Sequence, residues 1–173
     1  MRNLGYSRID PAEIDDNLIR LIASDWMLVT AGSREKFNTM TANWGGMGYL
    51  WKKPVVFVFV RPERYTYGFT ESHDGFTLTF FDEQYRDALN LCGTKSGRDC
   101  DKVAETGLTP FFTENGYPAF TEARLVLECR KLYASMLTRD AFTDGRPLRE
   151  HYSSMDGLHK LYIAEIEKVW IRE

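Results

Sequence analysis

The feature that most constrains the fold is a regular alternation of apolar and charged side chains in the last third of the chain. It runs along residues 122–134 and again along residues 159–171. The positions on the apolar faces are Ala123, Leu125, Leu127 and Cys129, then Tyr162, Ala164 and Ile166. The opposite faces carry Arg124, Glu128 and Arg130, interrupted only by Val126, then Glu165 and Glu167. A period of two residues is typical of strands with one buried face, so we expect two long strands here.

Shorter strands are expected in the first half of the chain. Residues 26–30 and 37–44 predict a hairpin whose turn lies at Ala31-Gly32-Ser33. Val55–Val60 follows Pro54 as an unbroken run of valine and phenylalanine, which is typical of a strand buried on both faces. Residues 76–81 predict one more strand.

Short helical segments separate these strands. Helices are expected at residues 65–72, near 83–91 and in a short stretch ending at Glu105, with a weaker helical signal at residues 11–24. No linker or internal repeat occurs, so we expect a single domain over residues 1–173. Strands at this spacing, with short helices inserted, favour an all-β dominated fold: a closed antiparallel barrel rather than a layered parallel sheet.

Charge and hydropathy exclude several classes of protein. The net charge is −3 and no dense Lys/Arg run occurs, which argues against a nucleic-acid partner. The apolar run Pro54–Val60 is far too short to cross a membrane. Met1–Asp16 is mostly polar and lacks the apolar core of a signal peptide. We therefore expect a cytoplasmic protein that binds neither nucleic acid nor membrane.

The cysteines and histidines show no metal-binding pattern. Cys92, Cys100 and Cys129 form no CxxC pair, and the three histidines are not grouped around them. We expect no metal and three reduced thiols, with Cys129 buried in its strand and the other two flanking a polar loop near a site. The chain has no GxGxxG or GxxxxGK[ST] loop, which argues against Rossmann and P-loop nucleotide sites.

Residues 38–46 form the first segment whose side chains are suited to bind a ligand. In a strand, Thr39, Thr41 and Asn43 share one face, and Met40, Ala42 and Trp44 share the other. The hydroxyls and the amide suit the polar edge of a heterocycle, and the small Ala42 and the glycines that follow allow a flat ring to approach the backbone. An exposed threonine-rich strand ending in a glycine turn explains the same pattern.

The second segment, Arg61–Tyr67, lies between a strand and a short helix. Two arginines, a hydroxyl and the N–H groups of a helix N-terminus together suit a phosphate. Ordinary surface ion pairs of Arg61 and Arg64 are the alternative. The third segment, Cys92–Lys102, contains two glycines and mixed charges, which suit an anionic ligand or a nicotinamide dinucleotide. A solvated connector with a helix N-cap is the alternative there.

His159 stands at the start of the final strand. A titrating imidazole at this position is suited to supply a proton or a hydrogen bond to a ring in the site, and a purely structural histidine is the alternative. His73 and His151 receive no role from the sequence.

Several segments, in this order, resemble the flavin reductase-like family with the FMN-binding split barrel, and most closely its flavoredoxin-like branch. The segments are Trp26–Gly32, Asn38–Gly46, Leu50–Pro54, Phe59–Thr66, Cys92–Lys102, Glu122–Tyr133 and His159–Ile166. The resemblance implies a six-stranded antiparallel barrel and a homodimer that binds FMN near the subunit interface. One departure is Trp44-Gly45-Gly46, where better-known reductases carry smaller polar residues.

The resemblance also implies site residues and an activity. Flavin contacts are expected from Thr39, Thr41, Ala42, Asn43 and Trp44, and phosphate contacts from Arg61, Arg64, Tyr65 and Thr66, with Lys95, Ser96 and Arg98 near the flavin and His159 as the catalytic residue. The expected function is an NAD(P)H-dependent flavin reductase that passes electrons to an acceptor protein or to free flavin. The alternatives are an FMN electron carrier without direct NAD(P)H oxidation, a non-catalytic flavin-binding module, and a barrel that has lost flavin.

Overall fold

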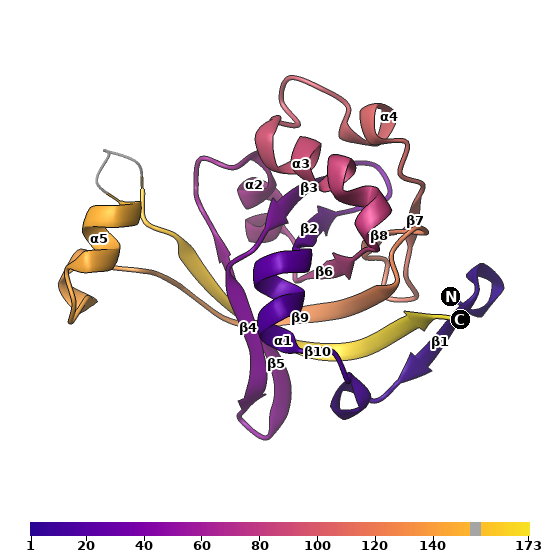
Figure 1. The fold of residues 1–173 in the computed structure, drawn as a ribbon, viewed down its shortest axis with the longest axis horizontal. Helices are drawn as coiled ribbons and strands as arrows, with labels where there is room; N and C mark the ends of the chain where they lie inside the picture. Colours follow the sequence, from indigo (N-terminus) through magenta and orange to yellow (C-terminus); the bar gives the residue numbers. More distant parts are fainter. Residues whose placement is uncertain (153–156) are drawn as a thin grey trace.

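The computed structural model describes residues 1–152 and 157–173. Its main sheet has eight strands on the path β3-β2-β6-β9-β10-β5-β4, with β1 paired to β10 beside the path (Figure 1). The strands are β1 Tyr6–Ile9, β2 Met27–Gly32, β3 Phe37–Ala42, β4 Gly45–Leu50, β5 Lys53–Val60, β6 Gly75–Phe80, β9 Leu125–Met136 and β10 Lys160–Arg172. All pairings in this sheet are antiparallel. A small separate hairpin consists of β7 Pro110–Phe112 and β8 Pro118–Phe120.

The helices are short. They are α1 Leu18–Arg20, α2 Tyr65–Ser72, α3 Arg86–Thr94, α4 Lys102–Thr106 and α5 Arg146–His151, with 3-10 turns at Arg2–Leu4, Pro11–Glu13, Glu83–Tyr85 and Arg139–Ala141 and a π turn at Leu21–Asp25. The helix expected at residues 65–72 is confirmed as α2. Residues 11–24, where the helical signal is weak, form separate short turns instead of one helix, because Asp10 caps the 3-10 turn at Pro11–Glu13 and Asn17 caps α1. No helix among the described residues is long and apolar enough to cross a membrane.

The two ends of the sheet path are joined to each other. β3 ends at Ala42 and β4 begins at Gly45, so only Asn43 and Trp44 separate the first strand of the path from the last. Counting β3 and β4 as one bent strand reduces the seven strands of the path to the six expected of a split barrel. The predicted all-β, antiparallel barrel is therefore confirmed, with β1 as an additional strand.

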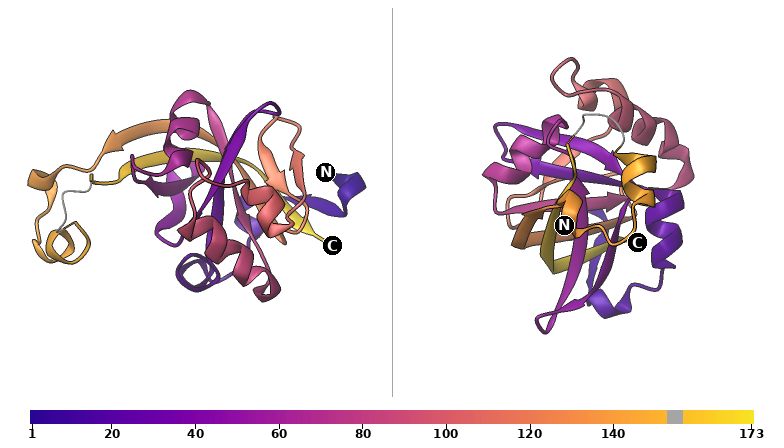
Figure 2. Two further views of the ribbon diagram at one scale, coloured as in Figure 1. Left: turned by 90° about the horizontal axis from the view of Figure 1, so that it is seen from above. Right: turned by 90° about the vertical axis from the view of Figure 1, so that its left-hand side faces the viewer.

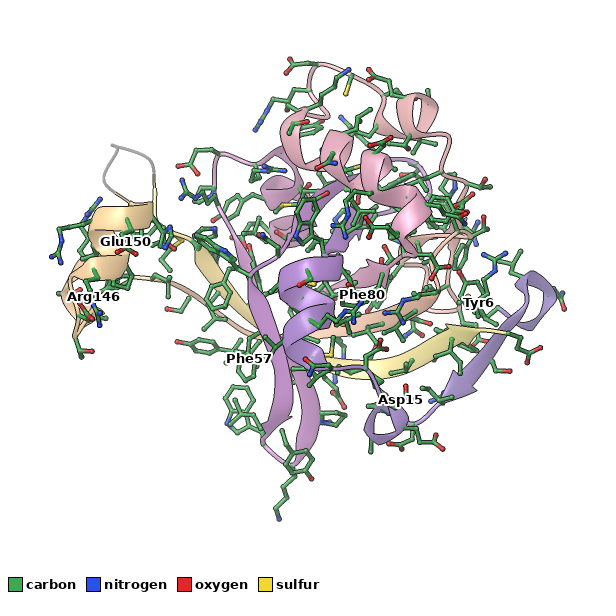
Figure 3. All side chains as sticks on the ribbon, in the orientation of Figure 1. Tyr6, Asp15, Phe57, Phe80, Arg146 and Glu150 are labelled. Atoms are coloured by element: carbon green, nitrogen blue, oxygen red, sulfur yellow. The ribbon has the colours of Figure 1, made fainter. Side chains whose placement is uncertain are left out.

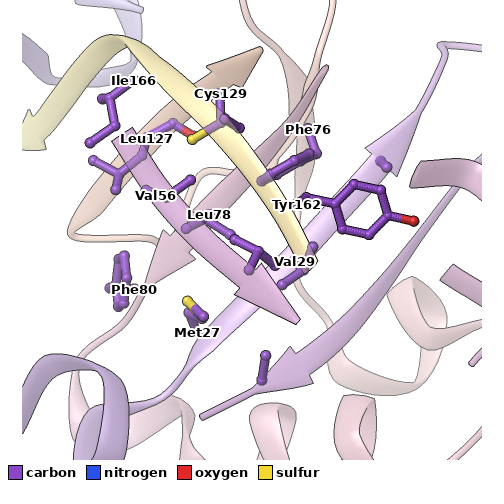
Figure 4. Packing of buried hydrophobic residues seen from close by; sticks show 14 of the residues in the cluster. Met27, Val29, Val56, Phe76, Leu78, Phe80, Leu127, Cys129, Tyr162 and Ile166 are labelled. Carbon is purple, nitrogen blue, oxygen red and sulfur yellow. The ribbon is translucent and has the colours of Figure 1, made fainter. Parts of the chain in front are cut away.

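The interior of the barrel holds the main apolar core. Val29, Val56, Leu78, Leu127 and Tyr162, from five different strands, are at most 1% exposed and point toward one another (Figure 4). The predicted apolar faces of β9 and β10 are the faces that line this interior. Cys129 is buried among them, as expected, and all three thiols are unpaired.

The first half of the barrel differs from expectation at two strands. A glycine turn is expected after Trp44, but Gly45–Leu50 forms β4 and pairs with β5. The hairpin turns at Trp51 and Lys52, whose φ angles of 53° and 58° match a type I′ turn. The glycines of β4 bring no side chains to cover Phe57, so this residue is half-buried and β5 is not buried on both faces.

A long excursion connects β9 to β10. It carries α5 and projects from one end of the barrel (Figures 1 and 2). Arg146 and Glu150 of α5 lie far from the barrel core (Figure 3). At the base of the excursion, the Leu137 N–H donates to the His159 carbonyl at 2.9 Å. The excursion therefore leaves and rejoins the barrel beside His159.

Candidate functional site

A cleft of about 200 Å³ lies at the barrel end where β3 and β5 finish and β10 begins. Its lining comprises Met40, Thr41, Ala42, Asn43, Trp44, Phe59, Arg61, Arg64 and His159. Residues from all three of these strand ends, far apart in the sequence, therefore meet in one cleft. The cleft brings together Thr41, Ala42, Asn43, Trp44, Arg61, Arg64 and His159 from the expected site residues.

The threonine face of β3 is already engaged within the protein. Thr39 is 2% exposed, and its hydroxyl lies 2.8 Å from that of Thr30. The Thr41 hydroxyl donates to the Leu89 carbonyl of α3, which packs on β3. Thr41 reaches the cleft lining while Thr39 does not. The two side chains share a face, as expected, but their hydroxyl hydrogen bonds are made to the protein.

The other face of β3 divides between core and cleft. Met40 and Ala42 are buried in the barrel core and also border the cleft. Asn43 and Trp44 form the exposed corner between β3 and β4. Ala42 therefore gives the cleft a small apolar floor beside an amide and an indole.

A second hollow, of about 110 Å³, adjoins this cleft and shares Arg64 with it. Its lining is Asn38, Glu63, Arg64, Tyr65, Thr66, Thr94, Lys95, Ser96, Gly97 and Lys102. The expected residues Tyr65, Thr66, Lys95 and Ser96 therefore meet here. Tyr65 and Thr66 begin α2, whose first N–H groups have no acceptor within the helix. A helix N-terminus with nearby cations favours a bound anion.

Arg64 connects the two hollows. Its guanidinium donates to the Gly93 carbonyl at 2.9 Å and to the Cys92 carbonyl at 3.4 Å, near the end of α3. Burial lowers the pKa of Arg64 from its ordinary value. These bonds hold a positive charge between the cleft and the second hollow.

Lys102 is a site residue that the sequence does not identify. It is 6% exposed, and its Nζ donates to the Thr39 and Cys92 carbonyls, each at 2.8 Å. Burial lowers the pKa of this amine. A single lysine in a polar loop carries no sequence signal of burial. Its position follows from the packing of α4 against α3, which lets its Nζ reach the Thr39 carbonyl of β3.

The expected loop residues separate in space. The Lys95 Nζ forms an ion pair with Glu105 at 2.5 Å at the edge of the second hollow. Arg98 is exposed, donates to the Glu63 carbonyl at 3.2 Å and stacks on Tyr65 at 4.8 Å. Arg98 lines a neighbouring basin of about 670 Å³, together with Thr39, and neither residue borders the cleft.

His159 is held in a cluster of rings. It is 9% exposed, and its centroid lies 5.2 Å from that of Trp44 and 6.4 Å from that of Phe59. Its Nδ1 lies 2.7 Å from the Tyr152 hydroxyl. Burial, with a contribution from Arg61, lowers the pKa of His159 to about 4. The imidazole is therefore neutral at physiological pH, which suits a hydrogen-bonding role better than proton supply.

The excursion supplies the other wall of this cluster. The Arg61 guanidinium lies 5.3 Å from the Tyr152 ring and donates to the His151 carbonyl at 2.9 Å. Trp44 contacts both His151 and His159, with ring centroids 5.1 Å and 5.2 Å apart. The sequence predicts no role for His151 or Tyr152, because only the return of the excursion to the barrel brings them to the cleft.

The arrangement suits a planar molecule that carries an anionic group. Aromatic rings and a small floor surround the cleft, and cations with a helix N-terminus surround the second hollow. Among residues 1–152 and 157–173, no cluster of three or more His, Cys, Asp or Glu side chains is placed to hold a metal ion.

Three solved structures show how closely the fold is shared. An FMN-binding domain of a flavin reductase-like enzyme from Shewanella baltica OS155 aligns with a TM-score of 0.70 and 18% identity, covering 96% of this chain and 77% of that chain. The flavoredoxin of Desulfovibrio vulgaris (Miyazaki F) aligns with a TM-score of 0.68 and 22% identity over 95% and 78%. An NADH:FAD oxidoreductase from Streptomyces globisporus C-1027 aligns with a TM-score of 0.61 and 17% identity over 86% and 74%.

Sequence comparison identifies the family. No curated protein sequence matches the chain. Residues 19–173, by contrast, match the family described as the flavin reductase like domain, and this match spans both hollows and every strand of the barrel path. The chain therefore belongs to the flavin reductase-like domain family.

Proposed function

We propose that the protein binds FMN and acts as an NAD(P)H-dependent flavin reductase. The observation that carries the proposal is the continuity of the two hollows through Arg64. One hollow offers aromatic walls and a neutral imidazole, and the other offers cations and the start of α2. FMN has the same two-part chemistry, a flat ring joined to a phosphate. The FMN-binding domain from Shewanella baltica shares the fold, which supports this choice of cofactor.

The protein's own groups are suited to hold the cofactor at both ends. Arg64 uses two N–H groups on α3 carbonyls and keeps others for a phosphate. Lys95, Ser96 and Thr66 stand around the same hollow. At the other end, Trp44 and Phe59 exclude water from a ring, and Ala42 lets it approach β3 closely. When bound, the flavin supplies the hydride-accepting and electron-donating chemistry.

The protein is further proposed to work as a homodimer. Tyr49 and Trp51 on the β4–β5 hairpin are 74% and 55% exposed, and Trp51 packs against the exposed Tyr133 at 6.5 Å. Exposed aromatic clusters of this kind are typical of protein interfaces. The electron acceptor is then a partner protein or free flavin that docks on the open side of the cleft.

The test is the visible spectrum of the purified protein, followed by FMN titration and anaerobic mixing with NADH and with NADPH. We expect a yellow protein, or one that binds added FMN, and bleaching by at least one nicotinamide. A colourless protein that does not bind FMN refutes cofactor binding. A protein that stays yellow with both nicotinamides refutes the reductase activity and favours an FMN electron carrier.

A further inference from the structure

We propose that Tyr152 is a positioning residue for His159: its hydroxyl donates to Nδ1, so that the single ring proton stays on Nε2. The assignment concerns the protein alone, and its consequence for a bound ring rests on the proposed function. Tyr152 comes from the α5 excursion, which no motif connects to the cleft.

The geometry holds the two side chains in one arrangement. The Tyr152 hydroxyl lies 2.7 Å from Nδ1, and Tyr152 is 5% exposed. Arg61 covers one side of the Tyr152 ring at 5.3 Å, and Phe142 lies 6.0 Å away. The phenol is therefore packed in place, and the imidazole meets it in a fixed orientation.

The hydrogen-bond partners available to the Tyr152 hydroxyl and to Nδ1 of His159 determine which group donates. Among the described residues, the Tyr152 hydroxyl has Nδ1 of His159 as its one hydrogen-bond partner. If Nδ1 carried the proton and donated, the buried O–H would have no acceptor. If the O–H donates, Nδ1 accepts and the buried hydroxyl is satisfied. The second arrangement satisfies both groups, so the proton lies on Nε2.

The charge state agrees with this arrangement. Burial and Arg61 keep the imidazole neutral, with a pKa of about 4, while Glu63 acts weakly in the opposite direction. Burial also raises the pKa of Tyr152, so its hydroxyl keeps its proton. A neutral imidazole with an acceptor Nδ1 must carry its one N–H at Nε2.

The consequence is a fixed N–H donor in the cleft. Within the described residues, Nε2 has no hydrogen-bond partner, and His159 lines the cleft. A donor at this position favours the more electron-rich form of a ring bound there. Loss of one such bond corresponds to about a tenfold weaker preference for that form, equivalent to about 30 mV for a two-electron couple.

The experiment compares wild type, Tyr152→Phe and the control Tyr85→Phe, whose ring lies 5.8 Å from that of Phe81 and borders neither the cleft nor the second hollow. Nitrogen-15 NMR of the cofactor-free protein, with labelled histidine, reports which nitrogen carries the proton, and His159→Gln assigns the signal. We expect Nε2–H in wild type and control, and a mixture of tautomers in Tyr152→Phe. Wild-type protein with Nδ1–H, or an unchanged tautomer in Tyr152→Phe, overturns the proposal.

A second measurement separates this proposal from the proposed function. With FMN bound, the midpoint potential of Tyr152→Phe is expected to be more negative than that of the control, by at most the shift of about 30 mV that complete loss of the Nε2–H bond would give. If Tyr152→Phe changes the tautomer of His159 but leaves the midpoint potential unchanged, Nε2–H does not stabilise the electron-rich form of the bound ring, and that part of the proposal is overturned. If FMN does not bind to wild type, the proposed function fails, and the NMR result alone decides the tautomer assignment.

Discussion

Substitution of Arg64 tests the proposed seat for the phosphate. Arg64→Ala removes a cation that borders both the cleft and the second hollow. A hydrogen bond to a charged group is worth about 1.5–3 kcal/mol, so FMN should bind about 10- to 150-fold more weakly. Riboflavin lacks the phosphate, and its affinity should change by less than about twofold. The loss is therefore expected to depend on the phosphate.

The same substitution also affects the folded protein. The Gly93 carbonyl loses its 2.9 Å donor, while the Cys92 carbonyl keeps Lys102. We expect a loss of about 1–2 kcal/mol in the free energy of unfolding. Arg86→Ala is a matched control, because Arg86 donates to the Ser24 carbonyl at 2.9 Å but borders neither hollow. It should be destabilised similarly and keep its affinity for FMN.

Fluorescence titration with FMN and riboflavin at fixed ionic strength, with urea unfolding, measures both effects. Unchanged FMN affinity in Arg64→Ala would refute the phosphate role. An equal loss of affinity for FMN and for riboflavin would show that the arginine acts on the whole site through folding, which also contradicts a specific contact with the phosphate.

Three further predictions concern stability, pH and assembly. The folded-state pKa of His159, about 4, lies below its ordinary 6.5, so unfolded chains bind its proton first as the pH falls. The contribution of His159 to the free energy of unfolding is therefore complete above pH 6.5 and decreases by about 1.4 kcal/mol per pH unit between pH 6.5 and pH 4. Urea unfolding of His159→Gln should lack this dependence on pH. Lys102→Met should cost about 1–2 kcal/mol, because the Thr39 carbonyl loses its 2.8 Å donor and keeps the longer 3.3 Å bond from the Asn38 amide; an unchanged urea midpoint would contradict this. Trp51→Asp should shift the protein to monomer in sedimentation, and a wild-type profile would argue against the hairpin as an interface.

The sequence predicts the elements whose pattern is local. The alternation in β9 and β10 and the helix α2 follow from neighbouring residues, and the structure confirms them. β4 is missed because its glycines have low strand propensity, and pairing with β5 overrides it. Glu128 lies on the expected outer face but is fully buried, where it accepts from the Trp170 indole at 2.7 Å.

The same distinction between local pattern and long-range packing applies to the site residues. The residues near Trp44 and Arg61 are close in sequence to recognisable strands, and they meet in the cleft. The spacing of Thr39 and Thr41 predicts their shared face but not that α3 covers it. Tyr152 and Lys102 reach the site only through long-range packing, which no single-sequence pattern records.

The excursion between β9 and β10 has an evolutionary consequence. Its base is tied to the barrel by the Leu137–His159 bond, and its Tyr152 and His151 stand at the rim of the cleft. Insertions or deletions in α5 would alter which molecules approach the cleft while leaving the strand ladders intact. Ligand choice can therefore diversify in this appendage without loss of the scaffold.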